Sequence, residues 1–265
     1  MSFSEHYLWC LREDPETGEQ VKVFGVLRLP AGAEEAAFTH LTLPTVVLAH
    51  GIGSSHEGMD AYAEGLSARG VVTYCLDLSG SARGRSDGDP LRMTVETQAL
   101  DVAAAVQLMS EEPFCDTDNL SLVGASQGGL ACAAFAARNP ARVKALALLY
   151  PAFCIHDDAI AAYPDPADVP DSYVTPAGVE VGRAYNLAAR ALDPFELMGE
   201  FGGDVLILHG DQDGLVDLSY SRRAARTFPR ATLEVQEGAG HGFAGGILDA
   251  AVARVCEFIK GEILR

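Results

Sequence analysis

Short and mainly apolar runs recur along this 265-residue chain, and stretches with helical periodicity separate several of them. Continuous apolar runs are typical of strands that are buried on both faces, as in a parallel sheet. The runs occupy residues 45–50, 71–78, 120–125, 145–150, 205–210 and 232–238. Repeated strand and helix predict a mostly parallel, doubly wound α/β sheet that is covered by helices on both faces.

The helical pattern is clearest in four stretches. They are residues 94–112, 128–140, 219–229 and 247–264, and the first begins at Thr94, which we expect to start a capping box. Before the first parallel strand, two extended segments at about 7–12 and 21–28 are separated by a polar turn. This arrangement predicts an antiparallel hairpin at the amino-terminal side of the sheet.

One connection is much longer than an ordinary turn. We expect residues 1–265 to form one domain with an insertion at about 152–200, where prolines 164, 166, 170 and 176 exclude a single continuous helix. Ligands of doubly wound sheets bind outside the carboxyl ends of the strands. The insertion therefore predicts a small cap over those ends, and the alternative is a surface excursion with no role.

Charge and apolar content exclude several classes of protein. The formal charge of −18, with only three lysines, argues against a nucleic-acid partner. The sequence shows neither a secretory signal nor an apolar span long enough for a membrane helix, so we expect a cytoplasmic protein without a membrane partner. Six cysteines without a CxxC pair predict buried, reduced thiols and no metal site.

The most informative motif is Gly124-Ala125-Ser126-Gln127-Gly128, a G-x-S-x-G between a predicted buried strand and a predicted helix. This context is typical of a sharp turn that exposes a serine hydroxyl above the sheet, with glycines two residues away to avoid collisions. The alternative is that Ser126 merely caps the following helix. We expect a nucleophile at Ser126.

A serine nucleophile needs a base, and the base needs an orienting acid. The last predicted strand leads into "GAGHGF", which contains His241, and the preceding one leads into "HGDQDGLVD", which offers Asp211, Asp213 and Asp217. The chain order of serine, acid and histidine is the order that this kind of sheet uses.

Together these motifs resemble those of the α/β-hydrolase family, in particular the cytoplasmic feruloyl (cinnamoyl) esterases. The resemblance spans "LAHGIGSSHEG", "LDLSGSARGRSDG", "LVGASQGG", "VGRAYNLAARALDP", "LILHGDQDGLVD" and "EGAGHGF". It implies an α/β-hydrolase fold in which Ser126 is the nucleophile and His241 the base. It also implies that Asp213 is the acid, with Asp211 as the second choice.

The resemblance extends to the oxyanion hole and the pocket. It implies that the backbone amides of Ile52 and Gln127 form the oxyanion hole, and it favours Tyr185 of the cap as a partner of a phenolic hydroxyl. We also expect Asp157 of the cap to bind such a hydroxyl. Tyr163, Tyr173 and Asp158 are further candidates in the cap. We expect His56 either to line the mouth of the pocket or to be an ordinary loop histidine, and His50 to hold its loop by a hydrogen bond.

These inferences predict a serine esterase that forms an acyl-enzyme on small aromatic or short-chain acyl esters, without cofactor or metal. The alternatives within this fold are a peptidase, a thioesterase, an acyltransferase and a peroxide-dependent enzyme. A non-turnover ligand receptor is an alternative of another class. The expected partner is a small-molecule ester, and a homodimer is common among the resembled esterases.

Overall fold

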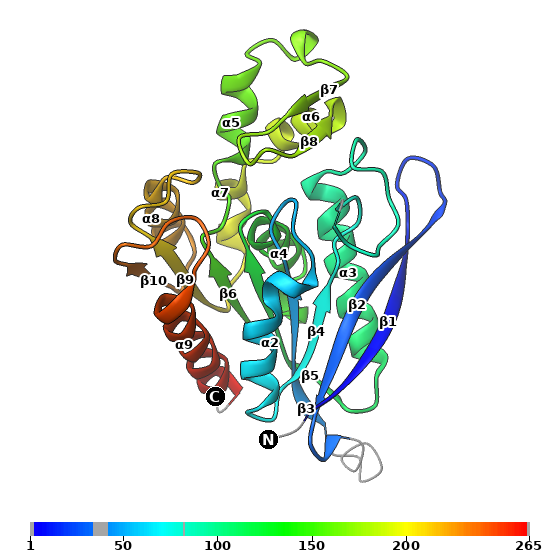
Figure 1. Ribbon diagram of the computed structural model, residues 1–265, viewed down its shortest axis with the longest axis vertical. Coiled ribbons are helices and arrows are strands. Elements are labelled where there is room, and N and C mark those ends of the chain that lie inside the picture. Colours follow the sequence, from blue (N-terminus) through cyan, green and yellow to red (C-terminus); the bar gives the residue numbers. More distant parts are fainter. Residues whose placement is uncertain (1–2, 34–41, 82, 264–265) are drawn as a thin grey trace.

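The computed structural model describes residues 3–33, 42–81 and 83–263. Within these residues, one sheet has eight strands in the order β1-β2-β4-β3-β5-β6-β9-β10 (Figure 1). The strands are β1 (Phe3–Glu13), β2 (Gln20–Pro30), β3 (Leu43–Ala49), β4 (Val72–Leu76), β5 (Cys115–Ala125), β6 (Ala145–Leu149), β9 (Asp204–Gly210) and β10 (Ala231–Gln236). The strands from β4 to β10 in this order pair in parallel, whereas β1–β2 and β2–β4 pair antiparallel. The predicted α/β architecture and amino-terminal hairpin are both present.

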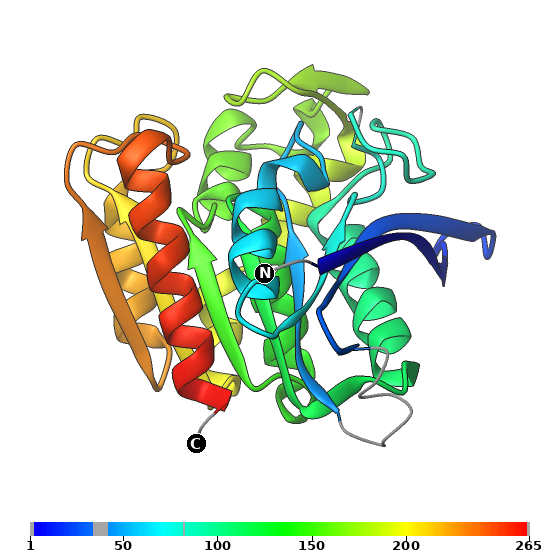
Figure 2. The same cartoon turned by 60° about the horizontal axis from the view of Figure 1, so that its bottom comes forward.

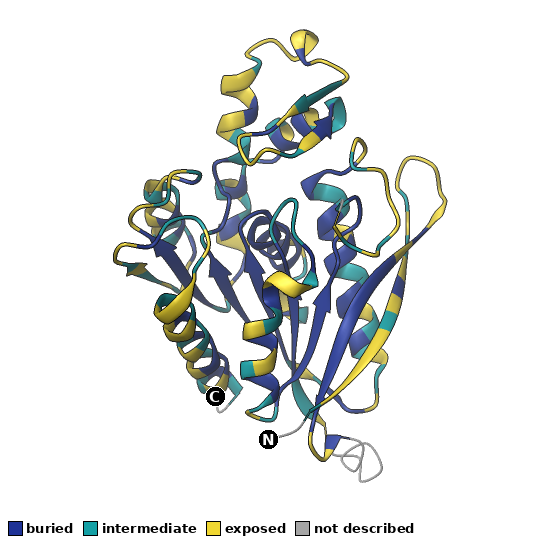
Figure 3. Ribbon diagram, viewed as in Figure 1, coloured by how far each residue is buried: buried dark blue, intermediate teal, exposed yellow. Residues whose placement is uncertain are grey.

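Helices cover both faces of the sheet. On one face, α2 (Asp60–Ser67) and α9 (Gly245–Ile263) pack in the same apolar cluster (Figure 2). On the other face lie α3 (Val95–Glu111), α4 (Gln127–Arg138) and α8 (Leu218–Thr227). The central strands are consequently buried on both sides, while β1 at the edge is largely exposed (Figure 3).

The helix ends show what the sequence pattern could and could not resolve. Thr94 caps α3 as expected, but its capping-box partner is Thr97, whose hydroxyl accepts a hydrogen bond from the Thr94 amide at 2.9 Å. Helix α2 is not predicted from the sequence. Its eight residues give too short a stretch for a helical period to stand out.

The insertion lies over the carboxyl ends of the parallel strands (Figure 1). It contains α5 (Ile155–Ala162), a short helix (Pro166–Asp168), the hairpin β7 (Ser172–Val174) and β8 (Glu180–Gly182), α6 (Arg183–Ala191) and α7 (Pro194–Leu197), followed by a turn of helix at Met198–Glu200. The side-chain amide Nδ2 of Asn186 in α6 donates a 2.9 Å hydrogen bond to the backbone carbonyl of Ala159 in α5, which fixes the two helices together. We call this insertion the cap.

Two further observations concern the whole described chain. All six cysteines fall within it, and each is buried and free. None of the described helices combines the length and apolar content needed to cross a bilayer.

Candidate active site

The turn between β5 and α4 places Ser126 at the carboxyl edge of the sheet. Its backbone is in the left-handed region, with φ 51° and ψ −121°, and its side chain does not cap α4. A Cβ added at Gly128 would lie 2.3 Å from the carbonyl oxygen of His50, and one at Gly124 would lie 2.6 Å from the carbonyl oxygen of Gly128. The two glycines are therefore required by close backbone contacts, as the motif predicted.

Ser126, His241 and Asp213 are hydrogen-bonded in series. Ser126 Oγ lies 2.9 Å from His241 Nε2, and His241 Nδ1 lies 2.8 Å from Asp213 Oδ2. Because a carboxylate can only accept, Nδ1 carries the proton and Nε2 is left to accept from the serine hydroxyl. Such a series can remove the serine proton as the oxygen attacks a carbonyl carbon.

Four donors surround the Asp213 carboxylate. Oδ1 accepts from the amides of Leu215 and Val216, both at 2.9 Å, while Oδ2 faces His241 and, at 3.2 Å, Nε2 of His209. Burial opposes ionisation of this carboxyl, but the hydrogen bonds outweigh it and hold the pKa of Asp213 well below its usual range. Asp213 is therefore charged at neutral pH and can stabilise a positively charged imidazole.

His209, which is not predicted from the sequence as a site residue, is completely buried at the end of β9. Its Nε2 is also 3.0 Å from the carbonyl oxygen of Val216, so two acceptors face this nitrogen and it must carry the proton. Its Nδ1 accepts from the hydroxyl of Ser221 at 2.7 Å. The only sequence signal was a histidine at the end of an apolar run, because the partners come from a later loop and from α8.

The two other carboxylates in this region have different partners. Asp211 accepts a 2.8 Å hydrogen bond from the Gly238 amide, in the turn after β10. Asp217 caps α8 by accepting from the Ser219 amide. Of the three carboxylates left open by the sequence, the structure brings Asp213 to His241.

The loop after β3 lies against Ser126. A Cβ added at Gly51 would be 3.6 Å from Ser126 Oγ. The amides of Ile52 and Gln127 donate to no backbone acceptor in the described loops and turns, and both residues line one pocket with Ser126. Two unused amide donors beside a serine hydroxyl can stabilise an oxyanion.

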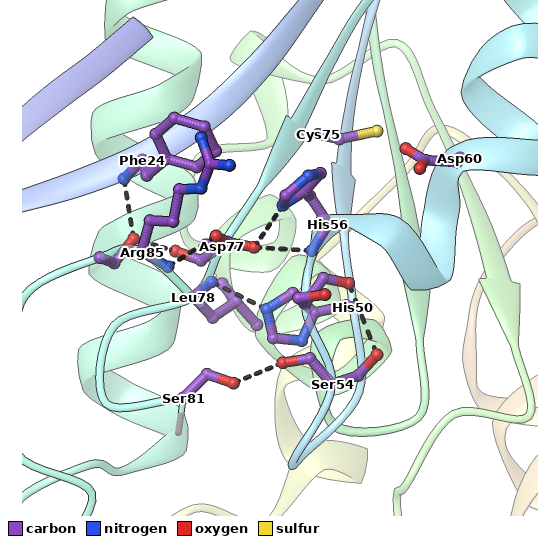
Figure 4. Close-up of polar contacts among 12 residues, drawn as sticks. Phe24, His50, Ser54, His56, Asp60, Cys75, Asp77, Leu78, Ser81 and Arg85 are labelled. Carbon is purple, nitrogen blue, oxygen red and sulfur yellow. Dashed lines mark hydrogen bonds and ion pairs between the residues drawn. The ribbon is translucent and has the colours of Figure 1, made fainter. Parts of the chain in front are cut away.

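His50 holds this loop, as expected from the sequence (Figure 4). Its Nδ1 lies 2.7 Å from the carbonyl oxygen of Gly51, and its Nε2 accepts from the Leu78 amide at 3.0 Å. Burial lowers the pKa of His50, so the ring is neutral. A neutral ring is also required by the Leu78 hydrogen bond, because Nε2 can accept only when it carries no proton. The Leu78 contact links the loop after β3 to the segment that follows β4.

The Tyr185 hydroxyl is already engaged. It donates a 2.6 Å hydrogen bond to Gln127 Oε1, and Gln127 Nε2 donates to Gln98 Oε1 at 2.7 Å. This hydrogen bond joins the cap to the first residue of α4, and the expected hydrogen bond of Tyr185 to a phenolic substrate stays a prediction. Its ring still lines the pocket.

Asp157 and His56 lie away from the pockets around Ser126. Asp157 accepts from the hydroxyl of Tyr220 at 2.9 Å, whereas the adjacent Asp158 lines the pocket. One residue of α5 turns the side chain by about 100°, which the sequence pattern could not resolve. Asp158 thus takes the position expected for Asp157, and His56 is not among the residues that line these pockets.

His56 forms a partly buried ion pair. Its Nδ1 lies 2.8 Å from Oδ1 of the completely buried Asp77, which also accepts from the amides of His56 and Arg85 (Figure 4). The hydrogen bond with Asp77 raises the pKa of His56, although burial opposes this. The pair joins the start of the helical turn His56–Met59 to the end of β4.

This ion pair predicts a pH-dependent contribution to stability. Because the folded-state pKa of His56 is raised, the stabilisation is complete below the unfolded value of about 6.5 and is lost as the pH rises through the folded-state pKa. We expect His56→Gln to lower the free energy of unfolding by about 1.5–3 kcal/mol at pH 6, and by less at pH 9. Urea unfolding of the wild type and the variant at pH 6 and pH 9 measures this difference in the free energy of unfolding.

The control is His6→Gln, which changes an exposed histidine of β1. We expect its effect to be small at both pH values. A destabilisation by His56→Gln that is equal at pH 6 and pH 9 would contradict the prediction, because it would mean that the charge of the imidazole adds nothing to stability.

Two hollows meet at Ser126. The first, the cap pocket, is lined by Ser126, Gln127, Ile155 and Tyr185 among others and has a volume of about 50 Å³. It shares Ile155 and Tyr185 with a deeper hollow of about 80 Å³ that reaches Tyr173 and Asn186. The second, the loop cavity, has a volume of about 350 Å³. Its lining includes Ser54, Ser126, Tyr150 and His241.

Comparisons with known proteins agree with this fold. A family model described as serine aminopeptidase, S33 matches residues 42–167, just under half of the chain. Est1E from Butyrivibrio proteoclasticus with ferulic acid bound is 25% identical, with a TM-score of 0.85 over 97% of this chain and 100% of that one. A second structure of Est1E is 23% identical, with a TM-score of 0.83 over 98% and 99%.

A more distant structure, DcsB in complex with its substrate analogue, is 20% identical, with a TM-score of 0.78 over 98% of this chain and 99% of that one. At this identity the match concerns the fold alone. The strand order, the cap above the strand ends and these similarities lead to one conclusion. The protein has the α/β-hydrolase fold, and its structure is similar to that of Est1E from Butyrivibrio proteoclasticus.

Proposed function

We propose that this protein is a serine carboxylic-ester hydrolase that works through an acyl-enzyme. The observation that carries the proposal is the series of hydrogen bonds from Ser126 through His241 to Asp213. In the first half-reaction, Ser126 Oγ bonds to the acyl carbon while its proton passes to His241 Nε2. The bond to the alcohol oxygen then breaks, and His241 returns the proton to that oxygen.

The second half-reaction uses water in place of the alcohol. His241 takes a proton from water, and the new oxygen bonds to the acyl carbon. The ester bond to Ser126 then breaks as His241 returns the proton to Ser126 Oγ. In both halves the negative charge that develops on the carbonyl oxygen is stabilised by the amides of Ile52 and Gln127. Asp213 keeps His241 in the required tautomer and stabilises its charged form.

We propose that the acyl group is small and aromatic, of the feruloyl or cinnamoyl type, or a short aliphatic chain. The cap pocket supports this, because its walls are mainly apolar and only Asp158 among its lining residues is charged. Asp158 and Tyr173 line the deeper hollow and are suited to accept from, or donate to, a phenolic hydroxyl. Similarity to a protein solved with ferulic acid bound supports the same class.

Steady-state hydrolysis of methyl ferulate, p-nitrophenyl acetate and p-nitrophenyl butyrate tests this proposal, with an alanine p-nitroanilide added as a peptidase substrate. We expect the aromatic ester to give the highest kcat/KM and the anilide to give none. Turnover of only the p-nitrophenyl esters would retain the esterase and reject the feruloyl preference. Faster anilide cleavage would favour a peptidase, and a single turnover with retained ligand would favour a receptor.

Two other expectations from the sequence stay predictions, namely a cytoplasmic location and a homodimer. The proposed small-molecule partner is the ester substrate.

A further inference from the structure

Among the described residues other than glycine, two have a positive φ, and both are at the active site. They are Ser126, at 51°, and Tyr150, at 37°, directly after β5 and the adjacent strand β6. A positive φ is unfavourable for a bulky side chain, and such strain is concentrated at functional sites. The strain at Tyr150 therefore points to a role for its side chain, because a glycine would adopt this backbone without it.

The backbone around Tyr150 is fixed to the nucleophile turn. The Tyr150 amide donates to the carbonyl of Leu208 in β9 at 2.7 Å, and the Ser126 amide donates to the carbonyl of Leu149 at 2.9 Å. The Ala152 amide in turn donates to the carbonyl of Ser126 at 3.0 Å. These bonds hold the tyrosine at a set position relative to Ser126.

The ring of Tyr150 packs against the proposed base. Its centroid is 4.9 Å from that of His241 and 4.9 Å from that of Phe243, edge to face in both cases. Burial, with a smaller effect of Asp213, raises the pKa of Tyr150 to about 12, so the phenol is protonated at neutral pH. Within the described part of the chain this hydroxyl has no hydrogen-bond partner.

The loop cavity, which Tyr150 lines, is on the side of the leaving alcohol. His241 must deliver its proton to the alcohol oxygen, so the alcohol leaves on the side of the imidazole. His241 and Gly242 line the loop cavity, whereas neither lines the cap pocket. At about 350 Å³ the loop cavity is in the range of small-molecule sites, and a methanol leaving group would leave most of it unfilled.

We propose that Tyr150 determines alcohol specificity, by donating a hydrogen bond from its phenol to a second oxygen of a polyhydroxylated alcohol in the loop cavity. This inference rests on the proposed ester hydrolysis and names the alcohol half of its substrate. The ring packs edge to face against His241 and lines the loop cavity beside it, and the hydroxyl donates to an oxygen of the alcohol other than the one that leaves. A simple methyl ester has no group for it to bind.

The experiment compares two esters of one acid, the methyl ester and the 1-glyceryl ester of the acyl group that the wild-type enzyme hydrolyses best. We expect the wild type to favour the glyceryl ester. Tyr150→Phe keeps the ring and removes the hydroxyl, and we expect it to lower kcat/KM for the glyceryl ester roughly tenfold, mainly through KM, with no change for the methyl ester.

Tyr62→Phe is the matched control. Tyr62 belongs to the apolar cluster against which Tyr150 packs, and its hydroxyl is buried without a partner, but it does not line the loop cavity. We expect this variant to keep the wild-type ratio of the two esters. Thermal unfolding of both variants verifies that they are folded.

Three results would overturn the inference. They are an unchanged ratio in Tyr150→Phe, an equal fall on both esters, which would indicate that the tyrosine acts only by packing against His241, and the same change in Tyr62→Phe. Failure of the proposed function is recognised separately, because Ser126→Ala would then leave the turnover of both esters intact.

Discussion

Ser126→Ala is expected to lower kcat for every ester that the wild type hydrolyses by about 10⁴- to 10⁶-fold, since nucleophile and base act as a unit. Alanine removes the hydroxyl that lies 2.9 Å from His241 Nε2 and leaves Asp213 and the amide donors in place. The turnover that remains in this variant comes from substrate binding and oxyanion stabilisation alone. Steady-state kinetics on p-nitrophenyl butyrate measures the loss.

A matched control is Ser121→Ala, which removes a buried hydroxyl from the same strand, β5. We expect it to keep the wild-type kcat. Mass spectrometry of acid-quenched wild-type enzyme during turnover is expected to show the mass of the acyl group on the peptide that contains Ser126. A Ser126→Ala protein that retains substantial turnover, or acylation on another peptide, would assign the nucleophile elsewhere.

Asp213→Asn is expected to lower kcat by about 10⁴-fold, the magnitude seen when the acid of a serine triad becomes an amide. Asparagine keeps the shape and can still accept from the amides of Leu215 and Val216. It loses the negative charge, and its amide group can donate to His241 Nδ1, which favours the tautomer with the proton on Nε2. That proton would face Ser126 Oγ and prevent His241 from acting as a base.

Asp211→Asn is the control for this prediction, because the sequence alone offered Asp211 as the alternative acid. Asp211 accepts from the Gly238 amide and is not bonded to His241. We expect full activity in Asp211→Asn, with thermal unfolding of both variants compared with wild type. Activity lost in Asp211→Asn and kept in Asp213→Asn would reverse the assignment.

Local patterns were enough for several parts of the site. The G-x-S-x-G motif located the strained turn at Ser126. A side chain at either glycine would collide with backbone atoms of the turn itself or of the adjacent β3 and the residue that follows it. Ser126, His241 and Asp213 each follow a strand, and the carboxyl ends of parallel strands lie along one edge of the sheet. The sequence alone therefore predicts that they lie close together.

Other parts depend on contacts that have no local signal. Nothing in the sequence distinguishes His209 and Ser221 from other residues. In the structure His209 lies next to Asp213, and it is held there by Ser221 of α8 and by the carbonyl of Val216. The Tyr185 hydroxyl was expected to be free for a substrate, but Gln127 takes it, because the cap folds back onto the start of α4. Helical rotation decides that Asp158, not Asp157, lines the cap pocket.

The sequence by itself determined the α/β fold, the position of the nucleophile turn and the strand ends that supply the base and acid. These follow from hydrophobic periodicity and from steric limits at glycines, which act between residues close in the chain. Only the tertiary structure decided which carboxylate meets His241, where His56 and Tyr185 are bonded, and that Tyr150 lines the alcohol side of the site. These depend on distances between segments far apart in sequence, and the packing of the whole chain sets those distances.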